Sequence, residues 1–281
     1  MSIHLGFDMG IRNLAYCMIE HFPDGKWSIS QWDNIDLLEN GQSSQLSKQC
    51  VACTAKAKYL GCDGKRWCKT CATGVRRKKN VTEKPAVGVL PCALDAKSLR
   101  SLAVSLNIEG AKKMKKEDLL HVLSSRYLMP WSPPKAMDVT LTDIRRAINK
   151  WLDSVLPTFK NCSLIRLENQ PVLKGPTMKS VQIILFTLLG HRLEREYGWT
   201  GAIEFVHAGY KSKDAVPSVT AEGVTAAQAE GKAYRDRKKT AETDVLGHLT
   251  RVGSSWLPFF LGRTKKSDLA DAFLMALRPT S

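Results

Sequence analysis

Four acidic residues stand where their side chains could share divalent metal ions. Asp8 ends the first apolar segment, and Glu168 ends a second one at residues 163–167. Asp268 and Asp271 are three residues apart in a predicted helix, so they share one face. Converging carboxylates repel one another unless a cation lies among them, and Mg²⁺ and Mn²⁺ favour such ligands. We predict a site for two Mg²⁺ (or Mn²⁺) ions, the arrangement that assists phosphodiester hydrolysis.

Each of these carboxylates also has an ordinary structural explanation. An Asp at the end of a strand is often a turn or cap residue, and Asp268 near a helix start is favourable to the helix dipole. The prediction therefore depends on the four residues taken together, in their order along the chain.

The elements that must position these residues indicate an α/β fold with a mixed five-stranded sheet and flanking helices. Alternating and apolar segments predict strands, and apolar positions at helical spacing predict helices. If the strands that end at Asp8 and Glu168 are neighbours, both carboxylates emerge at one sheet edge. Ser267 is the expected N-cap of the last helix, and Thr140 or Thr142 that of the first. The predicted strands are 3–7, 14–21, 26–35, 163–167 and 201–206, and the predicted helices are 139–156, 177–196, 221–249 and 267–277.

The charge of the chain predicts a polyanionic partner. The 281 residues include 42 basic and 27 acidic ones, a net charge of +15. Residues 48–135 alone hold 19 basic and 6 acidic residues. A surplus of this size favours nucleic acid, although a generally basic protein would share it. The shift in composition predicts an insert between two parts, 1–47 and 136–281, of one domain.

The first half of the insert, residues 48–90, has the cysteine spacing of a zinc ribbon. Two C-x₂-C pairs, Cys50 with Cys53 and Cys68 with Cys71, are separated by 14 residues. Four thiolates suit tetrahedral Zn²⁺, so we predict one structural zinc ion. The alternative is a set of free or redox-active thiols. Cys62 lies between the pairs and is left out of the predicted ligand set.

The second half, residues 91–130, resembles a SAP-type helix–loop–helix, a small DNA-binding motif. Apolar positions lead to Gly110, and a basic segment with Lys115 and Lys116 then opens a second helix. These two lysines, with Arg76 and Arg77 in the linker, are predicted to contact DNA. The alternatives are a plain packing unit of two helices and a solvated linker.

The residues around the carboxylates resemble those of the RuvC-type Holliday junction resolvases, in the RNase H-like superfamily. The resemblance is to the poxvirus, giant-virus and fungal mitochondrial group. It implies that Asp8, Glu168, Asp268 and Asp271 bind the metal ions. It also implies a homodimer that cuts four-way DNA junctions, or other branched DNA, with symmetric nicks that leave 5′-phosphates. The SAP-like motif departs from the mitochondrial members, which carry theirs at the N-terminus. The resembling segments are 6–13, 167–171, 174–179 and 265–271.

Polar residues beside the carboxylates are expected to contact DNA. Gln170 can hydrogen-bond a phosphate or orient a carboxylate, and four lysines can contact phosphates. Simple solvation of those lysines is the alternative. Farther along, the apolar segment 256–260 is expected to pack on the core, with insertion at the centre of the junction as the alternative. The four lysines are Lys174, Lys179, Lys265 and Lys266.

The sequence disfavours several other classes of protein. No apolar run reaches the roughly 18 residues of a membrane span, and the start of the chain lacks the features of a secretory signal. The metal-like cysteine spacing favours a reducing, intracellular compartment. Three alternatives to a junction nuclease remain: a nuclease for RNA–DNA hybrids or flaps, a non-catalytic junction-binding protein, and a zinc-dependent transcription or repair adaptor.

Overall fold

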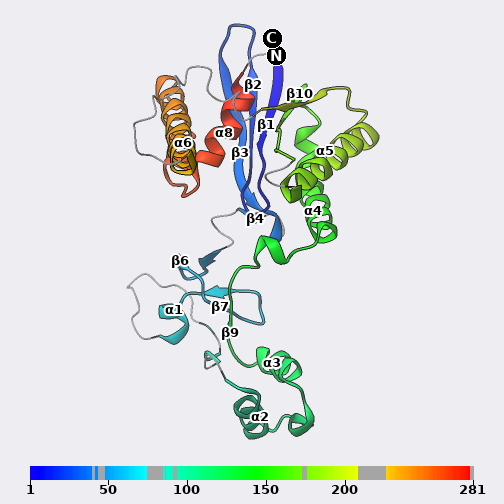
Figure 1. Cartoon of the computed structure of the whole chain (residues 1–281), viewed down its shortest axis with the longest axis vertical. Coiled ribbons are helices and arrows are strands. Elements are labelled where there is room, and N and C mark those ends of the chain that lie inside the picture. The colour runs from blue at the N-terminus through cyan, green and yellow to red at the C-terminus, as the bar shows by residue number, and fades with distance from the viewer. Residues whose placement is uncertain are drawn as a thin grey trace. The chain divides into compact units, whose positions relative to one another are not determined.

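The computed structural model describes residues 1–39, 42–43, 48–74, 85, 87–90, 94–172, 176–207 and 226–278. It divides into two compact units (Figure 1). Unit 1 joins Met1–Ser47 to Lys135–Ser281, and unit 2 is Lys48–Pro134.

Unit 1 is built on a mixed sheet, as the sequence predicts. The strand order is β11-β10-β1-β2-β3-β4, with β10 parallel to both β1 and β11 and the other pairs antiparallel. β4 is an additional edge strand of two residues, too short for an alternating pattern to reveal. The strands are β1 (Ser2–Asp8), β2 (Leu14–His21), β3 (Trp27–Asp36), β4 (Gln42–Ser43), β10 (Leu164–Glu168) and β11 (Ala202–Val206).

Helices cover both faces of this sheet (Figure 1). Leu5 and Phe7 of β1 pack in one core with Trp151 of α4 and Leu185 of α5. Side chains alternate along a strand, so Gly6 and Asp8 face the opposite side, where α6 and α8 lie. The helices are α4 (Leu141–Phe159), α5 (Pro176–Tyr197), α6 (Ala226–Arg251), α7 (Leu257–Leu261) and α8 (Lys266–Leu277), with 3₁₀ turns η1 (Leu37–Glu39) and η4 (Ala136–Asp138).

Two details of the helices bear on the sequence predictions. Thr140 caps α4, because its hydroxyl accepts a hydrogen bond from the Asp143 N–H at 3.2 Å. Segment 256–260 packs on the core as expected: Phe260 is 2% exposed and stacks on Trp32 with 5.3 Å between ring centroids. None of the helices in the described part of the chain is long and apolar enough to cross a membrane.

Gly6 allows α8 to lie directly on the sheet. A Cβ atom at this position would stand 2.4 Å from the Ala272 carbonyl oxygen and 2.8 Å from the Ala276 nitrogen. Both atoms belong to helix backbone, so only a shift of the helix could relieve the clash. The glycine thereby sets the distance between α8 and β1.

We expect Gly6→Ala to destabilise unit 1 by about 1–3 kcal/mol, the usual cost of overpacking a core. Gly247→Ala, in the exposed part of α6, is the matched control, since its added Cβ would meet nothing within 4 Å. That variant should be slightly stabilised, by about 0.4–1 kcal/mol, because alanine is the better helix former. Urea unfolding measures both. Equal stability of the two variants would refute the close approach of α8.

His4 is a buried titratable group on the same face of β1. It is 3% exposed, and its ring centroid lies 4.3 Å from that of His21. Burial, together with the nearby charges of His21 and Arg166, lowers the pKa of His4 from 6.5 to about 4. His4 is therefore neutral in the folded protein at pH values where the unfolded chain is protonated.

We expect the free energy of unfolding to fall as the pH is lowered from 6.5 towards 4. In this pH range His4 binds a proton in the unfolded chain but not in the folded protein. The free energy of unfolding therefore has its full value above pH 6.5 and decreases below it. The loss amounts to about 3 kcal/mol at most. His4→Gln should remove that part of the slope in urea titrations at several pH values. Parallel slopes for the two proteins would contradict the assignment.

Unit 2 contains two small cores. One surrounds the cysteines and Trp67, and the other lies between α2 and α3 around Leu99 and Leu119. The short strands form two sheets, β5-β6 and β8-β7-β9. The elements are β5 (Gln49–Cys50), β6 (Cys53–Lys56), β7 (Tyr59–Leu60), β8 (Arg66–Trp67), α1 (Lys69–Thr73), α2 (Ala96–Ser105), η3 (Ala111–Lys113), α3 (Lys116–Ser124) and β9 (Met129–Pro130).

Candidate functional site

Asp8 and Glu168 end two neighbouring parallel strands. Phe7 is paired with Leu167 in the register of β1 and β10, so Asp8 and Glu168 are the next residues of each strand. Parallel strands lie about 4.8 Å apart. The two acidic residues therefore lie side by side at one end of the sheet.

Both carboxylates lie on the sheet face that α8 covers. Arg166, two residues before Glu168, reaches that helix: its Nη1 donates to the carbonyls of Met275, at 3.0 Å, and Arg278, at 2.6 Å. Residues two apart on a strand share a face, so Glu168 points to the α8 side, as Asp8 does after Gly6. Arg166 is 2% exposed, which makes this attachment of the helix a buried one.

The direction of α8 brings its first turns towards the same edge. His21, paired with Ser2 at the start of β1, lies with Nε2 3.0 Å from the carbonyl of Ala276 near the helix end. The Trp32 indole donates to the Leu269 carbonyl, near the helix start, at 3.1 Å. The helix thus runs opposite to β1, and Asp268 and Asp271 lie towards the end that carries Asp8.

Asp268 is held by neighbours that the sequence did not single out. Its Oδ1 lies 3.0 Å from Nζ of Lys238, on α6, and accepts a hydrogen bond from the Ser267 hydroxyl at 3.1 Å. The expectation that Ser267 caps the helix is wrong, because α8 already begins at Lys266 and Lys265 takes the cap position. Lys238 stands in a run of similar charged residues, 235–239, so no sequence signal distinguished it.

Glu168 is oriented by the chain that follows β10. The Gln170 amide donates to its Oε2 at 2.8 Å, and the Gln170 N–H donates to the buried Gln182 side chain at 3.1 Å. Lys179 Nζ donates to Asn169 at 2.8 Å and to Gln182 at 3.0 Å. Gln170 and Lys179 therefore order this turn beside the carboxylate.

The carboxylates have the right chemistry for Mg²⁺, but their side chains are not gathered around one point. Within the residues that the structure describes, the four thiols of unit 2 are the only group of three or more ligand side chains close enough to share an ion. The four acidic residues lie towards one end of the sheet, but the carboxylates of Asp268 and Glu168 are turned to Lys238 and Gln170. An all-oxygen donor set of this kind suits a hard divalent cation.

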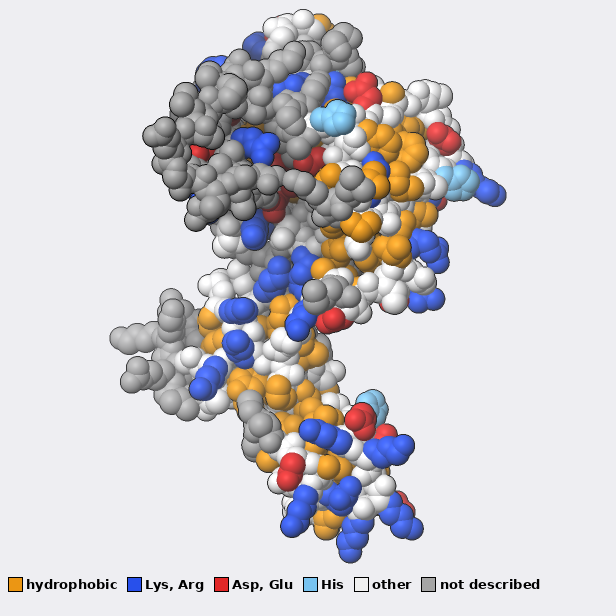
Figure 2. Space-filling view, viewed as in Figure 1, with side chains coloured by type: hydrophobic (Ala, Val, Ile, Leu, Met, Phe, Trp, Pro, Cys, Tyr) orange, Lys and Arg blue, Asp and Glu red, His pale blue; other side chains and the backbone are white. Residues whose placement is uncertain are grey.

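The remaining predicted contact residues are dispersed. Lys265 is exposed and Lys266 half-buried at the start of α8, next to Asp268. Lys115 and Lys116 are exposed at the start of α3 in unit 2. Lys and Arg side chains are prominent on the visible surface of unit 2 (Figure 2). Arg76, Arg77 and Lys174 lie outside the described residues.

The thiols of unit 2 are arranged as a tetrahedral zinc site would require. The sulfurs of Cys50, Cys53, Cys68 and Cys71 lie within 4.8 Å of one another, and that of Cys53 is 3.6 Å from Cys68 and 3.4 Å from Cys71. Four sulfurs about 2.3 Å from a central Zn²⁺ would stand about 3.8 Å apart. Cys62 is exposed and outside this group.

The environments of these thiols differ. Burial raises the pKa of Cys68 and of Cys71, while a hydrogen bond from the backbone of Ala55 lowers the pKa of Cys53. A metal ion would bind the four as thiolates and release their protons. The four cysteines are also part of an apolar core of unit 2. A metal ion bound to them would therefore also stabilise the fold of this unit.

The sequence matches no protein-family model and no curated protein. Among solved structures, the chain is similar to the yeast mitochondrial Holliday junction resolvase Ydc2. The identity is 12% and the TM-score 0.42, over 98% of this chain and 78% of that one.

Proposed function

We propose that the protein is a metal-dependent, structure-selective endonuclease of the RuvC type, with an RNase H-like catalytic domain, that resolves four-way DNA junctions. The observation that supports the proposal is the position of four acidic residues, from three separate elements, towards one end of the sheet. Asp8 and Glu168 are neighbours in register, and α8 directs Asp268 and Asp271 towards them. Carboxylates scattered evenly over the surface would not be expected to lie together at one end of the sheet.

In this proposal Asp8, Glu168, Asp268 and Asp271 hold two Mg²⁺ or Mn²⁺ ions. Such ions, when bound, stabilise the attacking and leaving oxygens of a phosphodiester displacement. The protein's own groups orient the ligands: the Gln170 amide fixes Glu168, and Lys238 with Ser267 fixes Asp268. Lys238 also balances part of the acidic charge, which lowers the cost of gathering four carboxylates.

Unit 2 contributes to DNA binding. One Zn²⁺ held by the four thiols stabilises the fold of its first half, and the basic residues of unit 2 bind phosphates of the junction arms. Lys115 and Lys116 are exposed on α3, as such contacts require. The proposed contact set also includes Arg76, Arg77, Gln170, Lys174, Lys179, Lys265 and Lys266. Affinity through phosphate contacts of this kind falls steeply with salt. A homodimer would present two active sites to two strands, as symmetric nicking requires.

Competing substrates test this function against its nearest alternatives. Cleavage rates of a four-way junction, a flap and an RNA–DNA hybrid of equal length should be compared in Mg²⁺. We expect the junction to be cut at least tenfold faster than the others. Faster cutting of the hybrid or the flap would assign the same carboxylates to that substrate instead.

A further inference from the structure

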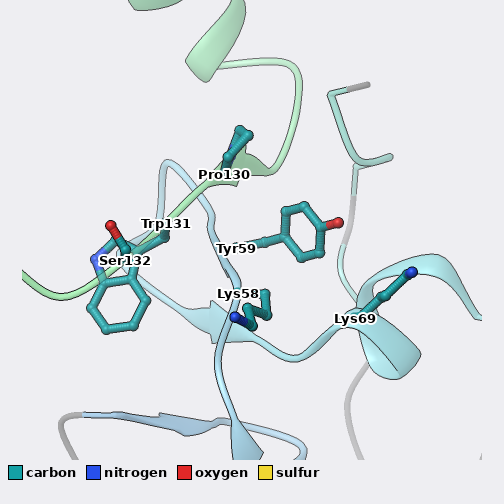
Figure 3. A pocket seen from close by; sticks show the side chains of 6 residues that line it. All are labelled: Lys58, Tyr59, Lys69, Pro130, Trp131 and Ser132. Atoms are coloured by element: carbon teal, nitrogen blue, oxygen red, sulfur yellow. The ribbon is translucent and has the colours of Figure 1, made fainter. Parts of the chain in front are cut away.

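Unit 2 has a pocket that the proposed function does not use. The pocket measures about 430 Å³, within the range of roughly 300–1,000 Å³ typical of sites for small ligands. None of its described lining side chains is acidic. The lining residues are Lys58, Tyr59, Lys69, Pro130, Trp131 and Ser132 (Figure 3).

Trp131 supplies an aromatic side chain to the pocket. The backbone N–H of Trp131 donates to the Lys58 carbonyl at 2.8 Å, which extends the pairing of β7 with β9 by one residue. Arg66 of β8 lies on the same face of this small sheet, and its guanidinium is 4.7 Å from the centre of the indole. Trp131 nevertheless remains only half-buried, so part of the ring is accessible.

Two lysines and a hydroxyl line the same pocket as Trp131. Lys58 and Lys69 are exposed, and in Figure 3 Lys69 projects from α1 on the side of the view opposite to Trp131 and Ser132. Lys69 stands between two of the clustered cysteines, Cys68 and Cys71, so the fold around the thiols also places this wall of the pocket.

We infer that this pocket binds one unstacked nucleotide of single-stranded DNA, with its base on Trp131 and its phosphates near Lys58 and Lys69. Aromatic stacking combined with a cationic groove is how proteins bind single strands without sequence preference. A base inside a duplex is covered by its neighbours and cannot reach the indole. The inference adds to the proposed function by naming an unpaired segment of branched DNA as the feature that unit 2 recognises.

The test is the affinity of the full-length protein for a labelled 12-nucleotide thymidine strand and for a duplex of equal length, measured by fluorescence anisotropy. Loss of one stacked base corresponds to about 5- to 150-fold weaker binding. We expect this loss for Trp131→Ala on the single strand, less than twofold change on the duplex, and partial recovery in Trp131→Phe. Equal losses on both DNAs, or none on either, would overturn the inference.

The lysines supply a second readout that does not depend on the tryptophan. The double variant Lys58→Ala/Lys69→Ala should reduce the slope of log affinity against log salt by about 1.4 on the single strand. Lys26→Ala, an exposed lysine of unit 1 in the turn between β2 and β3, is the control and should leave the slope unchanged. A slope unchanged from wild type in the double variant would overturn the phosphate contacts, as would poly-glutamate that competes as well as unlabelled DNA.

Failure of this inference is separable from failure of the proposed function. A wild-type protein that cuts junctions while Trp131→Ala binds single strands normally would refute the pocket alone. A protein that cuts nothing, but loses single-strand binding in Trp131→Ala, would refute the nuclease alone.

Discussion

Asp8→Asn is expected to abolish DNA cleavage while leaving junction binding within about twofold of wild type. Asp8 is 8% exposed at the end of β1, beside Glu168 in the register. An amide in its place keeps the shape but removes the negative charge that a divalent cation requires. Metal ions contribute several kcal/mol to phosphodiester displacement, and each 1.36 kcal/mol is tenfold in rate, so the loss should reach about 10³-fold.

Asp24→Asn is the matched control for this variant. Asp24 is exposed in the turn between β2 and β3, where it pairs with Lys26 at 2.8 Å. The same chemical change there should leave cleavage unaltered. Single-turnover cleavage and anisotropy titrations separate the catalytic effect from binding. Cleavage by Asp8→Asn at the control's rate would remove Asp8 from the catalytic site.

Removal of the proposed zinc ion is expected to unfold the first half of unit 2 while the sheet of unit 1 stays folded. The thiols form the centre of a core with few other apolar residues, Trp67 and Tyr59 among them. Structural zinc in small domains is worth about 10–16 kcal/mol of folding free energy, far more than so small a core supplies. Cys68→Ser should therefore lose bound zinc, protease resistance within 48–74, and most of the affinity for DNA.

Cys17→Ser is the control for this variant, because Cys17 is a buried cysteine of β2 in unit 1, remote in sequence from the thiol cluster. It should keep one zinc per chain by metal analysis and keep unit 2 resistant to protease. If Cys68→Ser retained both properties, the thiols would be ordinary core residues.

The sequence was most informative where a periodic apolar pattern, or a fixed spacing, included a residue with a specific chemistry, such as an acid or a cysteine. The antiparallel meander and the α4 and α5 helices follow from alternation and helical spacing, with boundaries within a few residues. Asp8 and Glu168 were predictable neighbours, because two apolar strands that end in an acid place both acids at one edge once those strands pair. Cys50, Cys53, Cys68 and Cys71 were predictable from spacing alone, since two-residue gaps let paired thiols face one ion.

Other features depend on tertiary packing that no local pattern encodes. The pairing of Lys238 with Asp268 requires α6 and α8 to lie side by side, and residues 235–239 look alike in sequence. Ser267 has the side chain of a typical cap residue, but α8 starts one residue earlier. The Ser267 hydroxyl donates to the Asp268 carboxylate instead. The role of Gly6 could not be predicted from the sequence, because the α8 atoms close to it belong to residues 266 or more positions farther along the chain.

The most direct test of the central claim is the cleavage map of a four-way junction labelled in turn on each of its four strands. The junction is incubated with wild type or Asp271→Asn, in Mg²⁺ or in EDTA. We predict paired nicks at symmetric positions in two opposing strands, which need Mg²⁺ and are absent with Asp271→Asn although that variant still binds. Tight binding of the junction without cutting, under Mg²⁺ or Mn²⁺, would contradict the account and indicate a protein that only binds branched DNA.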